Sequence, residues 1–131
     1  MTKQQRSRVM SRIGGKDTRS ELRLRSLLHG LGYRYRLHDR RLPGRPDLVF
    51  PSRSKVVFVH GCFWHRHTCR KGRSMPSSRV EFWRAKLERN RLRDRRVQRQ
   101  LRALGWGVMV VWECQLADPH RLEQRIRRFL G

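Results

Sequence analysis

Residues 55–69 read KVVFVHGCFWHRHTC, an apolar strand that runs directly into a cluster of sulfur and imidazole side chains. The start, KVVFV, is typical of a strand buried on both faces of a sheet. The next ten residues hold two of the chain's three cysteines, three of its six histidines and a Phe-Trp pair. Three structures would explain this cluster: a loop closed by a disulfide, a metal site, or a catalytic and binding surface that a metal holds rigid.

The composition indicates that nucleic acid is the partner of this chain. Its 131 residues fit one domain, and 33 Lys and Arg against 10 Asp and Glu give a formal net charge of +23. Of the basic residues 28 are arginine, which favours bidentate contacts to phosphate. A membrane surface is the alternative, but no apolar stretch approaches the roughly 20 residues that span a bilayer. The basic start MTKQQRSRVMSR predicts no secretory signal, so we expect a cytoplasmic protein in which a disulfide is disfavoured.

The hydrophobic pattern predicts one domain over residues 18–131, preceded at residues 1–17 by a basic, glycine-punctuated arm. The arm is either a disordered tail or a flexible segment that orders on DNA. Strands are expected at 33–37, 46–50, 55–60 and 107–114. Helices are expected from Thr18 to about Gly30–Gly32, over 78–104, and from Asp118-Pro119 onwards.

The expected helix at 78–104 carries two polar residues on its inward stripe. The stripe alternates steps of three and four residues, in the order Val80, Trp83, Leu87, Asn90, Asp94, Val97, Leu101, Leu104. A buried carboxylate is costly unless something pairs with it. Either the stripe reaches the surface at Asp94, or Asp94 meets one of the arginines, or it faces a functional group.

The cysteines favour a zinc site. Cys62, His67 and Cys69 offer three ligands within eight residues, and Cys114 ends the last expected strand. Neighbouring strands lie about 4.8 Å apart, so adjacent strands at 55–60 and 107–113 would bring Cys114 beside the loop. A Cys₃His set leaves zinc no open position, which predicts a structural ion. The alternative is three buried free thiols and a surface histidine.

Carboxylates and the remaining histidines favour a nuclease. Asp47 opens a strand expected near His60, and Glu21 lies on the first helix. Such groups can hold magnesium and activate water for phosphodiester hydrolysis. Each alone has a simpler explanation: Asp47 as a turn residue, Glu21 as the capping-box partner of Thr18, and His60 as a core histidine. Together, in a chain this basic, they favour hydrolysis of nucleic acid.

Six segments, taken in order, resemble the very short patch repair (Vsr) DNA mismatch endonucleases. They are KDTRSELRLRSLL (16–28), GYRYRLH (32–38), LPGRPDLVF (42–50), VHGCFWHRHTC (59–69), EFWRAKLERN (81–90) with Asp94, and VVWEC (110–114). The resemblance implies an α/β fold like that of restriction endonucleases, a mixed sheet flanked by helices. It also implies a monomer that nicks one strand 5′ of the thymine in T:G mismatches, which arise when 5-methylcytosine deaminates, and so initiates repair.

The resemblance implies catalytic roles for individual residues. Asp47 would bind Mg²⁺ together with the main-chain carbonyl of Val59. His65 would transfer a proton and be oriented by Asp94. Beside them, His60 would assist at the reacting phosphate, and Glu21 would support the site from the first helix.

The same resemblance implies structural and DNA-contacting roles. The ligands of a structural Zn²⁺ would be Cys62, His67, Cys69 and Cys114. The side chains inserted into the base stack would be Phe63, Trp64 and Trp83, with Met10 and Ile13 of the arm approaching from the minor groove. The alternative is that Phe63 and Trp64 cover the zinc site and that Trp83 packs within its helix.

The implied partner is double-stranded DNA with a T:G mismatch, in a cytoplasmic, nucleoid-associated protein. A functional link to a cytosine-5 DNA methyltransferase, and to mismatch-repair proteins, is expected. One rival is a related nicking or restriction-type endonuclease of a restriction–modification system, with a different or relaxed target. Another is a basic zinc module that only binds DNA, but such a module would not need Asp47, His60, His65 and Glu21.

Overall fold

The computed structural model describes residues 18–131, so the predicted arm, with Met10 and Ile13, lies outside the described residues. The described chain forms, in order, α2 (Arg19–Gly30), β1 (Arg36–Leu37), β2 (Leu48–Phe50), η1 (Pro51–Arg53), β3 (Lys55–His60), α3 (Val80–Ala103), β4 (Gly107–Trp112), η2 (Glu113–Ala117) and α4 (Pro119–Leu130). The prefix η marks a short 3₁₀ helix. No helix within residues 18–131 has both the length and the apolar character needed to cross a membrane.

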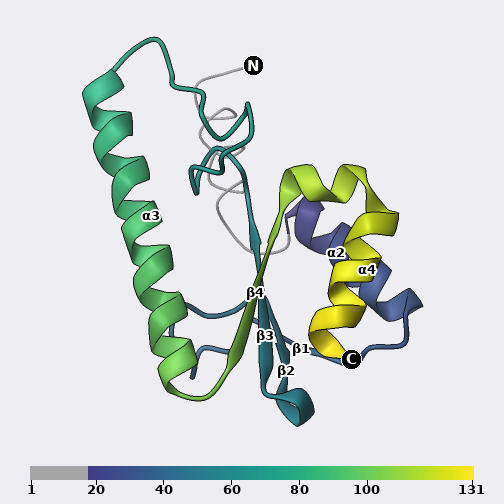
Figure 1. Cartoon of the computed structure of the whole chain (residues 1–131). Helices are drawn as coiled ribbons and strands as arrows, with labels where there is room; N and C mark the ends of the chain where they lie inside the picture. Colours follow the sequence, from purple (N-terminus) through teal and green to yellow (C-terminus); the bar gives the residue numbers. More distant parts are fainter. Residues whose placement is uncertain (1–17) are drawn as a thin grey trace.

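The sheet is mixed, with the strand order β1-β2-β3-β4. Strand β2 is antiparallel to both β1 and β3, whereas β3 and β4 run parallel from Lys55↔Gly107 to His60↔Trp112. A parallel pair needs a long crossover connection, which α3 provides here. Helix α3 covers one face of the sheet, and α2 and α4 cover the other (Figure 1). The predicted mixed sheet flanked by helices is confirmed.

Each face of the sheet has its own hydrophobic core. On the α2 and α4 side, leucines of α2 pack with Phe50, Val57 and the apolar stripe of α4. On the other side, Val56 and Phe58 pack against Leu101 of α3. Because side chains alternate along a strand, β3 contributes to both cores, which explains its nearly continuous apolar sequence.

Two expectations at the ends of elements are wrong. Leu104 does not belong to the inward stripe: it caps the C-terminus of α3 and is 63% exposed. The strand expected at 33–37 is reduced to Arg36–Leu37, and Leu37 is 43% exposed. Tyr33 and Tyr35 still pack edge-on against Phe50, so their alternation reflects burial without strand pairing.

Candidate active site and metal centre

Glu21 lies in the first turn of α2 and is almost completely buried, with 1% of its surface exposed. Its backbone N–H donates to Oγ1 of Thr18 over 3.2 Å, as a helix cap requires. Its side chain instead forms a 2.8 Å hydrogen bond with Nε2 of His38 and an ion pair with Arg25. The capping-box explanation therefore accounts for the backbone of Glu21 but not for its carboxylate.

Asp47 lies immediately before β2, next to Glu21. The backbone N–H of Val59 donates to its Oδ2 over 2.7 Å. Burial, followed by a side-chain hydrogen bond with Glu21, raises the pKa of Asp47 to about 8. The Asp47 carboxyl therefore keeps its proton at neutral pH, and a bound cation would have to displace it.

The ligand atoms of Glu21, His38 and Asp47 all lie within 4.8 Å of one another. Carboxylate oxygens are the ligands that Mg²⁺ prefers, so the two carboxylates of this set fit a hard divalent cation. The set joins α2 to the hairpin that contains β1 and β2. Coordination by the main-chain carbonyl of Val59 stays a prediction.

Both polar residues on the stripe of α3 face the loop after β3. Asp94 Oδ2 lies 2.5 Å from Nδ1 of His65, and Asn90 Nδ2 donates to the carbonyl of Trp64 over 3.2 Å. A carboxylate only accepts hydrogen bonds, so Nδ1 of His65 carries the proton and Nε2 is its basic nitrogen. Of the three explanations for Asp94, the contact with His65 favours the one in which it faces a functional group, and the catalytic role of His65 stays a prediction.

His60 ends β3 and lies flat against His65, with ring centroids 3.9 Å apart and an angle of 5° between the planes. Only 5% of its surface is exposed. Burial, followed by the nearby His65, lowers the pKa of His60 to about 3, so the ring is neutral at physiological pH. Because Val59 precedes it and contacts Asp47, consecutive residues of β3 join the acidic cluster to the histidine pair.

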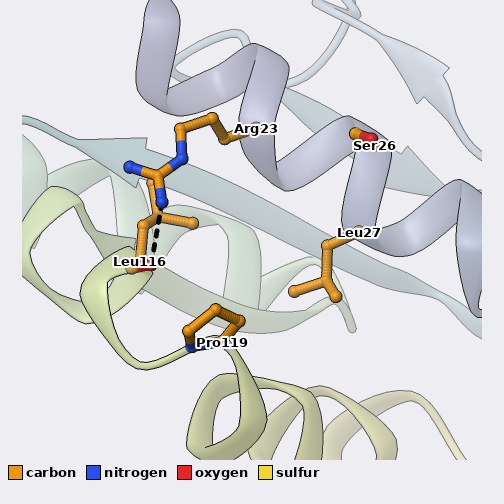
Figure 2. Close-up of a pocket in the computed structure, with 5 residues that line it drawn as sticks. All are labelled: Arg23, Ser26, Leu27, Leu116 and Pro119. Atoms are coloured by element: carbon orange, nitrogen blue, oxygen red, sulfur yellow. Dashed lines mark hydrogen bonds between the residues drawn. The ribbon is translucent and has the colours of Figure 1, made fainter.

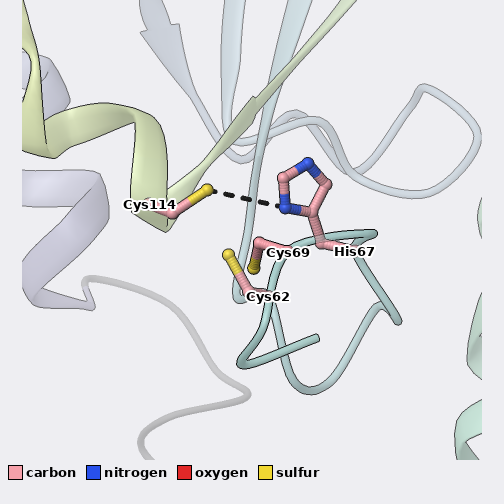
Figure 3. Close-up of side chains that lie close together, drawn as sticks. All are labelled: Cys62, His67, Cys69 and Cys114. Carbon is pink, nitrogen blue, oxygen red and sulfur yellow. Dashed lines mark hydrogen bonds between the residues drawn. The ribbon is translucent and has the colours of Figure 1, made fainter. Parts of the chain in front are cut away.

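A second cluster consists of Cys62, His67, Cys69 and Cys114, whose ligand atoms all lie within 4.8 Å of one another (Figure 3). Parallel pairing of β3 with β4 brings Cys114, in η2, beside the loop, as the strand argument predicted. Sγ of Cys114 is 3.5 Å from Nδ1 of His67. Three sulfurs and one imidazole nitrogen form a closed set suited to zinc.

Neighbouring groups change the pKa values of the thiols and hold the loop that carries them. Burial raises the pKa of Cys62 to about 12, whereas a backbone hydrogen bond from Gly72 is the main cause that lowers the pKa of Cys69 to about 6. The backbone N–H of Cys62 donates to Glu113 Oε1 over 3.1 Å, and Glu113 in turn pairs with Lys71 at 3.0 Å. Glu113 of η2 therefore contacts the loop near both of its ends, at Cys62 and at Lys71.

Phe63, Trp64 and Trp83 form one cluster of half-buried rings, with centroid separations from 5.2 to 6.0 Å. Nζ of Lys86 lies 5.6 Å from the centroid of each indole. Trp83 thus contacts the loop aromatics as well as belonging to the α3 stripe. The structure brings together the three side chains that were predicted to insert into DNA, and their insertion stays a prediction.

A pocket of about 320 Å³ lies between α2 and the start of α4, lined by Arg23, Ser26, Leu27, Leu116 and Pro119 (Figure 2). Arg23 crosses its edge to donate to the carbonyl of Leu116 over 3.1 Å. None of the predicted site residues within 18–131 lines this pocket, so it is separate from both clusters.

Sequence reasoning missed two residues of the site, His38 and Glu113. His38 could have been found from the hairpin: it follows the last residue of β1, and Leu37 pairs with Leu48, so His38 lies opposite Asp47. Glu113 has no comparable signal, because its contact with the backbone of Cys62 depends on how η2 turns after β4.

A buried acidic cluster next to a histidine paired with aspartate, in a strongly basic α/β domain, is an arrangement that suits one class of enzyme, nucleases that hydrolyse phosphodiesters. The chain belongs to the Vsr family of DNA mismatch endonucleases, because the model of that family, DNA mismatch endonuclease Vsr, matches residues 1–71. The resemblance noted in the sequence is confirmed.

Relatives with assigned names agree with this assignment. The type II nicking enzyme V.XorIIP of Xanthomonas oryzae pv. oryzae is 52% identical over 130 residues, 99% of this chain and 95% of its own length. The DNA mismatch endonuclease Vsr of Escherichia coli is 47% identical over 117 residues, 89% of this chain and 74% of its own. The type II nicking enzyme V.NmeAIP of Neisseria meningitidis is 40% identical over 129 residues, 98% of this chain and 91% of its own. The chain is a DNA endonuclease of the Vsr type.

Proposed function

We propose that this endonuclease depends on Mg²⁺ and nicks one strand 5′ of the thymine in T:G mismatches that arise from 5-methylcytosine deamination. One observation carries the proposal: the His65 ring, which is paired with Asp94, stacks on the ring of His60. His60 directly follows Val59, whose backbone N–H donates to Asp47. This arrangement supports the proposal, because it would put a cation site beside a proton-transfer residue, two kinds of group that phosphodiester hydrolysis needs. We infer that the fold is of the restriction-endonuclease type.

In this proposal His65 moves the proton. Its Nδ1 donates to Asp94, which fixes the tautomer and the orientation of the ring and leaves Nε2 to exchange a proton with the reacting group. The neutral ring of His60 packs against His65 and helps to keep water away from one face of that ring.

The acidic cluster holds the cation. Asp47, with the main-chain carbonyl of Val59, would bind Mg²⁺, and Glu21 would support it from α2. Bound magnesium would supply positive charge to the phosphodiester. We further propose that Zn²⁺ occupies the cysteine cluster, whose closed donor set serves structure and leaves the chemistry to the other groups.

Arginines supply affinity for DNA in this proposal. On α3, Arg91 pairs with Glu88, but Arg95, Arg99 and Arg102 are exposed. Phosphate contacts carry no sequence information. A protein that makes 6 to 10 of them loses about 10³–10⁵-fold in affinity for DNA between 50 and 200 mM salt. Choice of a mismatch must therefore come from base contacts and from the energy of deforming the duplex.

A strand-labelled nicking assay tests the function. We expect one cut, 5′ of the thymine, in a duplex with a single T:G pair, no cut in the matched C:G duplex, and no cut when a chelator removes magnesium. The position of the cut is read on a sequencing gel with each strand labelled in turn. Equal cutting of both duplexes, or cutting of both strands, would contradict the proposal.

The aromatic cluster is expected to read the mismatch. Separating bases costs a few kcal/mol per step and is easiest where pairing is already defective, and an exposed base regains about 1–3 kcal/mol by stacking on an aromatic ring. We therefore expect Phe63→Ala with Trp64→Ala to lower nicking of T:G duplexes much more than binding to C:G duplexes. Competition between the two duplexes at one salt concentration measures this effect.

The zinc content of that double variant is the control, because both residues lie in the loop between Cys62 and His67. Phe82→Ala is a matched substitution: Phe82 is an exposed aromatic residue next to Trp83 and should leave discrimination unchanged. A double variant with native zinc content that keeps the native preference for T:G would show that these rings do not read the mismatch.

A second candidate is a nicking enzyme that accompanies a restriction–modification system. The 52% identity to a protein named as a type II nicking enzyme favours this setting. In either setting we propose a monomer with a functional link to a cytosine-5 DNA methyltransferase and to mismatch-repair proteins. A panel of T:G duplexes with different flanking bases separates the two: cutting only within one methylation sequence indicates dedication to the methyltransferase that modifies it.

A further inference from the structure

His38 connects the two carboxyl groups of the acidic cluster. It comes directly after β1, and its backbone N–H donates to the carbonyl of Asp47 over 3.2 Å. Its backbone has φ of 47°, in the left-handed region, which most residues avoid and which His, Asn and Asp tolerate best outside glycine. The hairpin therefore holds His38 in an uncommon conformation directly beside Asp47.

The imidazole of His38 turns back toward α2. Its Nε2 lies 2.8 Å from Oε1 of Glu21, and the side chains of His38 and Glu21 are 14% and 2% exposed. Arg25 pairs with the other oxygen, Oε2, of Glu21. The two oxygens of this carboxylate are therefore contacted by different side chains, and these two contacts together fix its rotation as well as its position.

Fixing Glu21 matters because it faces a second carboxyl group. Their ligand atoms lie within 4.8 Å of one another, and two carboxylates this close repel each other unless they are held in place. Donors that hold a carboxylate from behind keep it in place against that repulsion. Groups of this kind, which orient ligands from outside, commonly change metal affinity about 10- to 100-fold.

We infer that His38 is a positioning residue for the reaction: it holds Glu21 against Asp47 so that both carboxylates can face one divalent cation. The inference deepens the proposed function and rests on its assignment of the cation to Asp47. It gives His38 no contact with the DNA and no proton to transfer, so it is separate from the roles of His60 and His65.

Two substitutions separate the imidazole from the backbone. His38→Asn keeps a residue that accepts the left-handed conformation, but its amide is too short to reach Glu21. His38→Gln carries an amide nitrogen about as far out as Nε2, yet it suits that backbone less well. If only the backbone conformation of residue 38 matters, the Asn variant should bind the cation more tightly than the Gln variant. If the imidazole positions Glu21, the Gln variant should bind it more tightly than the Asn variant.

The measurement is binding of Mn²⁺, a paramagnetic substitute for Mg²⁺, to the full zinc-loaded chain, monitored by the loss of the free-ion signal in electron paramagnetic resonance. We expect His38→Asn to weaken binding about 10- to 100-fold and His38→Gln to bind nearly as tightly as the native chain. Nicking at low magnesium should fall in the same order, and excess magnesium should restore much of the activity of His38→Asn. Native zinc content and thermal melting of both variants establish that they are folded.

Native Mn²⁺ affinity in folded His38→Asn, or weaker binding by Gln than by Asn, would overturn the inference. Asp47→Asn is measured alongside them. If it too binds Mn²⁺ and nicks normally, the proposed cation site itself is wrong. If only the Asp47 variant loses binding, the site stands and the role of His38 is rejected.

Discussion

Asp47→Asn is expected to abolish nicking of T:G duplexes while DNA binding stays near its native level. The amide keeps the size of the side chain but removes the negative charge that would hold the cation. Loss of several kcal/mol of charge stabilisation corresponds to a rate lower by roughly a thousandfold or more. Binding should survive because it comes mainly from arginines and from the aromatic cluster. Single-turnover nicking and a gel-shift titration, made on the same preparation, measure the two effects.

Asp39→Asn is the matched control for this experiment. Asp39 lies in the same hairpin but pairs with Arg41 at the surface, so its loss should leave nicking unchanged. His65→Ala should reduce nicking about as severely as Asp47→Asn, and Asp94→Asn should reduce it less, because Asp94 acts only by orienting His65. Near-native cutting by Asp47→Asn would move the cation site elsewhere.

Loss of a cysteine ligand should prevent stable folding. Zinc binding to a structural site contributes about 10 kcal/mol or more, which is comparable to the whole stability of a small domain, about 5–15 kcal/mol. We expect one tightly held zinc ion per chain, and Cys69→Ser or Cys114→Ser should give poorly folded protein without it. Elemental analysis and circular dichroism of the purified chains measure both quantities.

A histidine pair provides the control for the zinc experiment. His67→Ala removes an imidazole from the cluster, whereas His120→Ala removes an exposed one at the start of α4, and only the first should lower zinc content. A native chain that is still folded and metal-free after washing with a chelator would show that the cluster does not need zinc.

Side chains on regular elements were predictable from the sequence. Asp94 violated the apolar stripe of α3, and that violation correctly indicated a partner, which is His65. Adjacency of the strands that precede Cys62 and Cys114 was enough to bring the cysteines together. Helix periodicity fixes the position of Asp94, and strand adjacency fixes the positions of Cys62 and Cys114.

Features that depend on irregular backbone were not predictable in this way. The hairpin register places His38 opposite Asp47, but the sequence pattern does not reveal the left-handed conformation in which its imidazole reaches Glu21. Leu104 continued the stripe in the sequence, but α3 ends at Ala103 and the chain turns through Gly105, which has φ of 94°. Local backbone geometry, and not hydrophobicity, therefore determines where the side chains of His38 and Leu104 lie.

The parallel pairing of β3 with β4 restricts how the length of this chain can evolve. Trp112, opposite His60, contacts the rings of both His60 and His67, and Cys114 lies two residues further along the chain. Deleting one residue within β4 would shift the rest of the strand by about 3.3 Å and turn its side chains to the opposite face. One such event would separate Trp112 from both histidines and Cys114 from its cluster, so lineages that retain activity should carry insertions and deletions outside this strand.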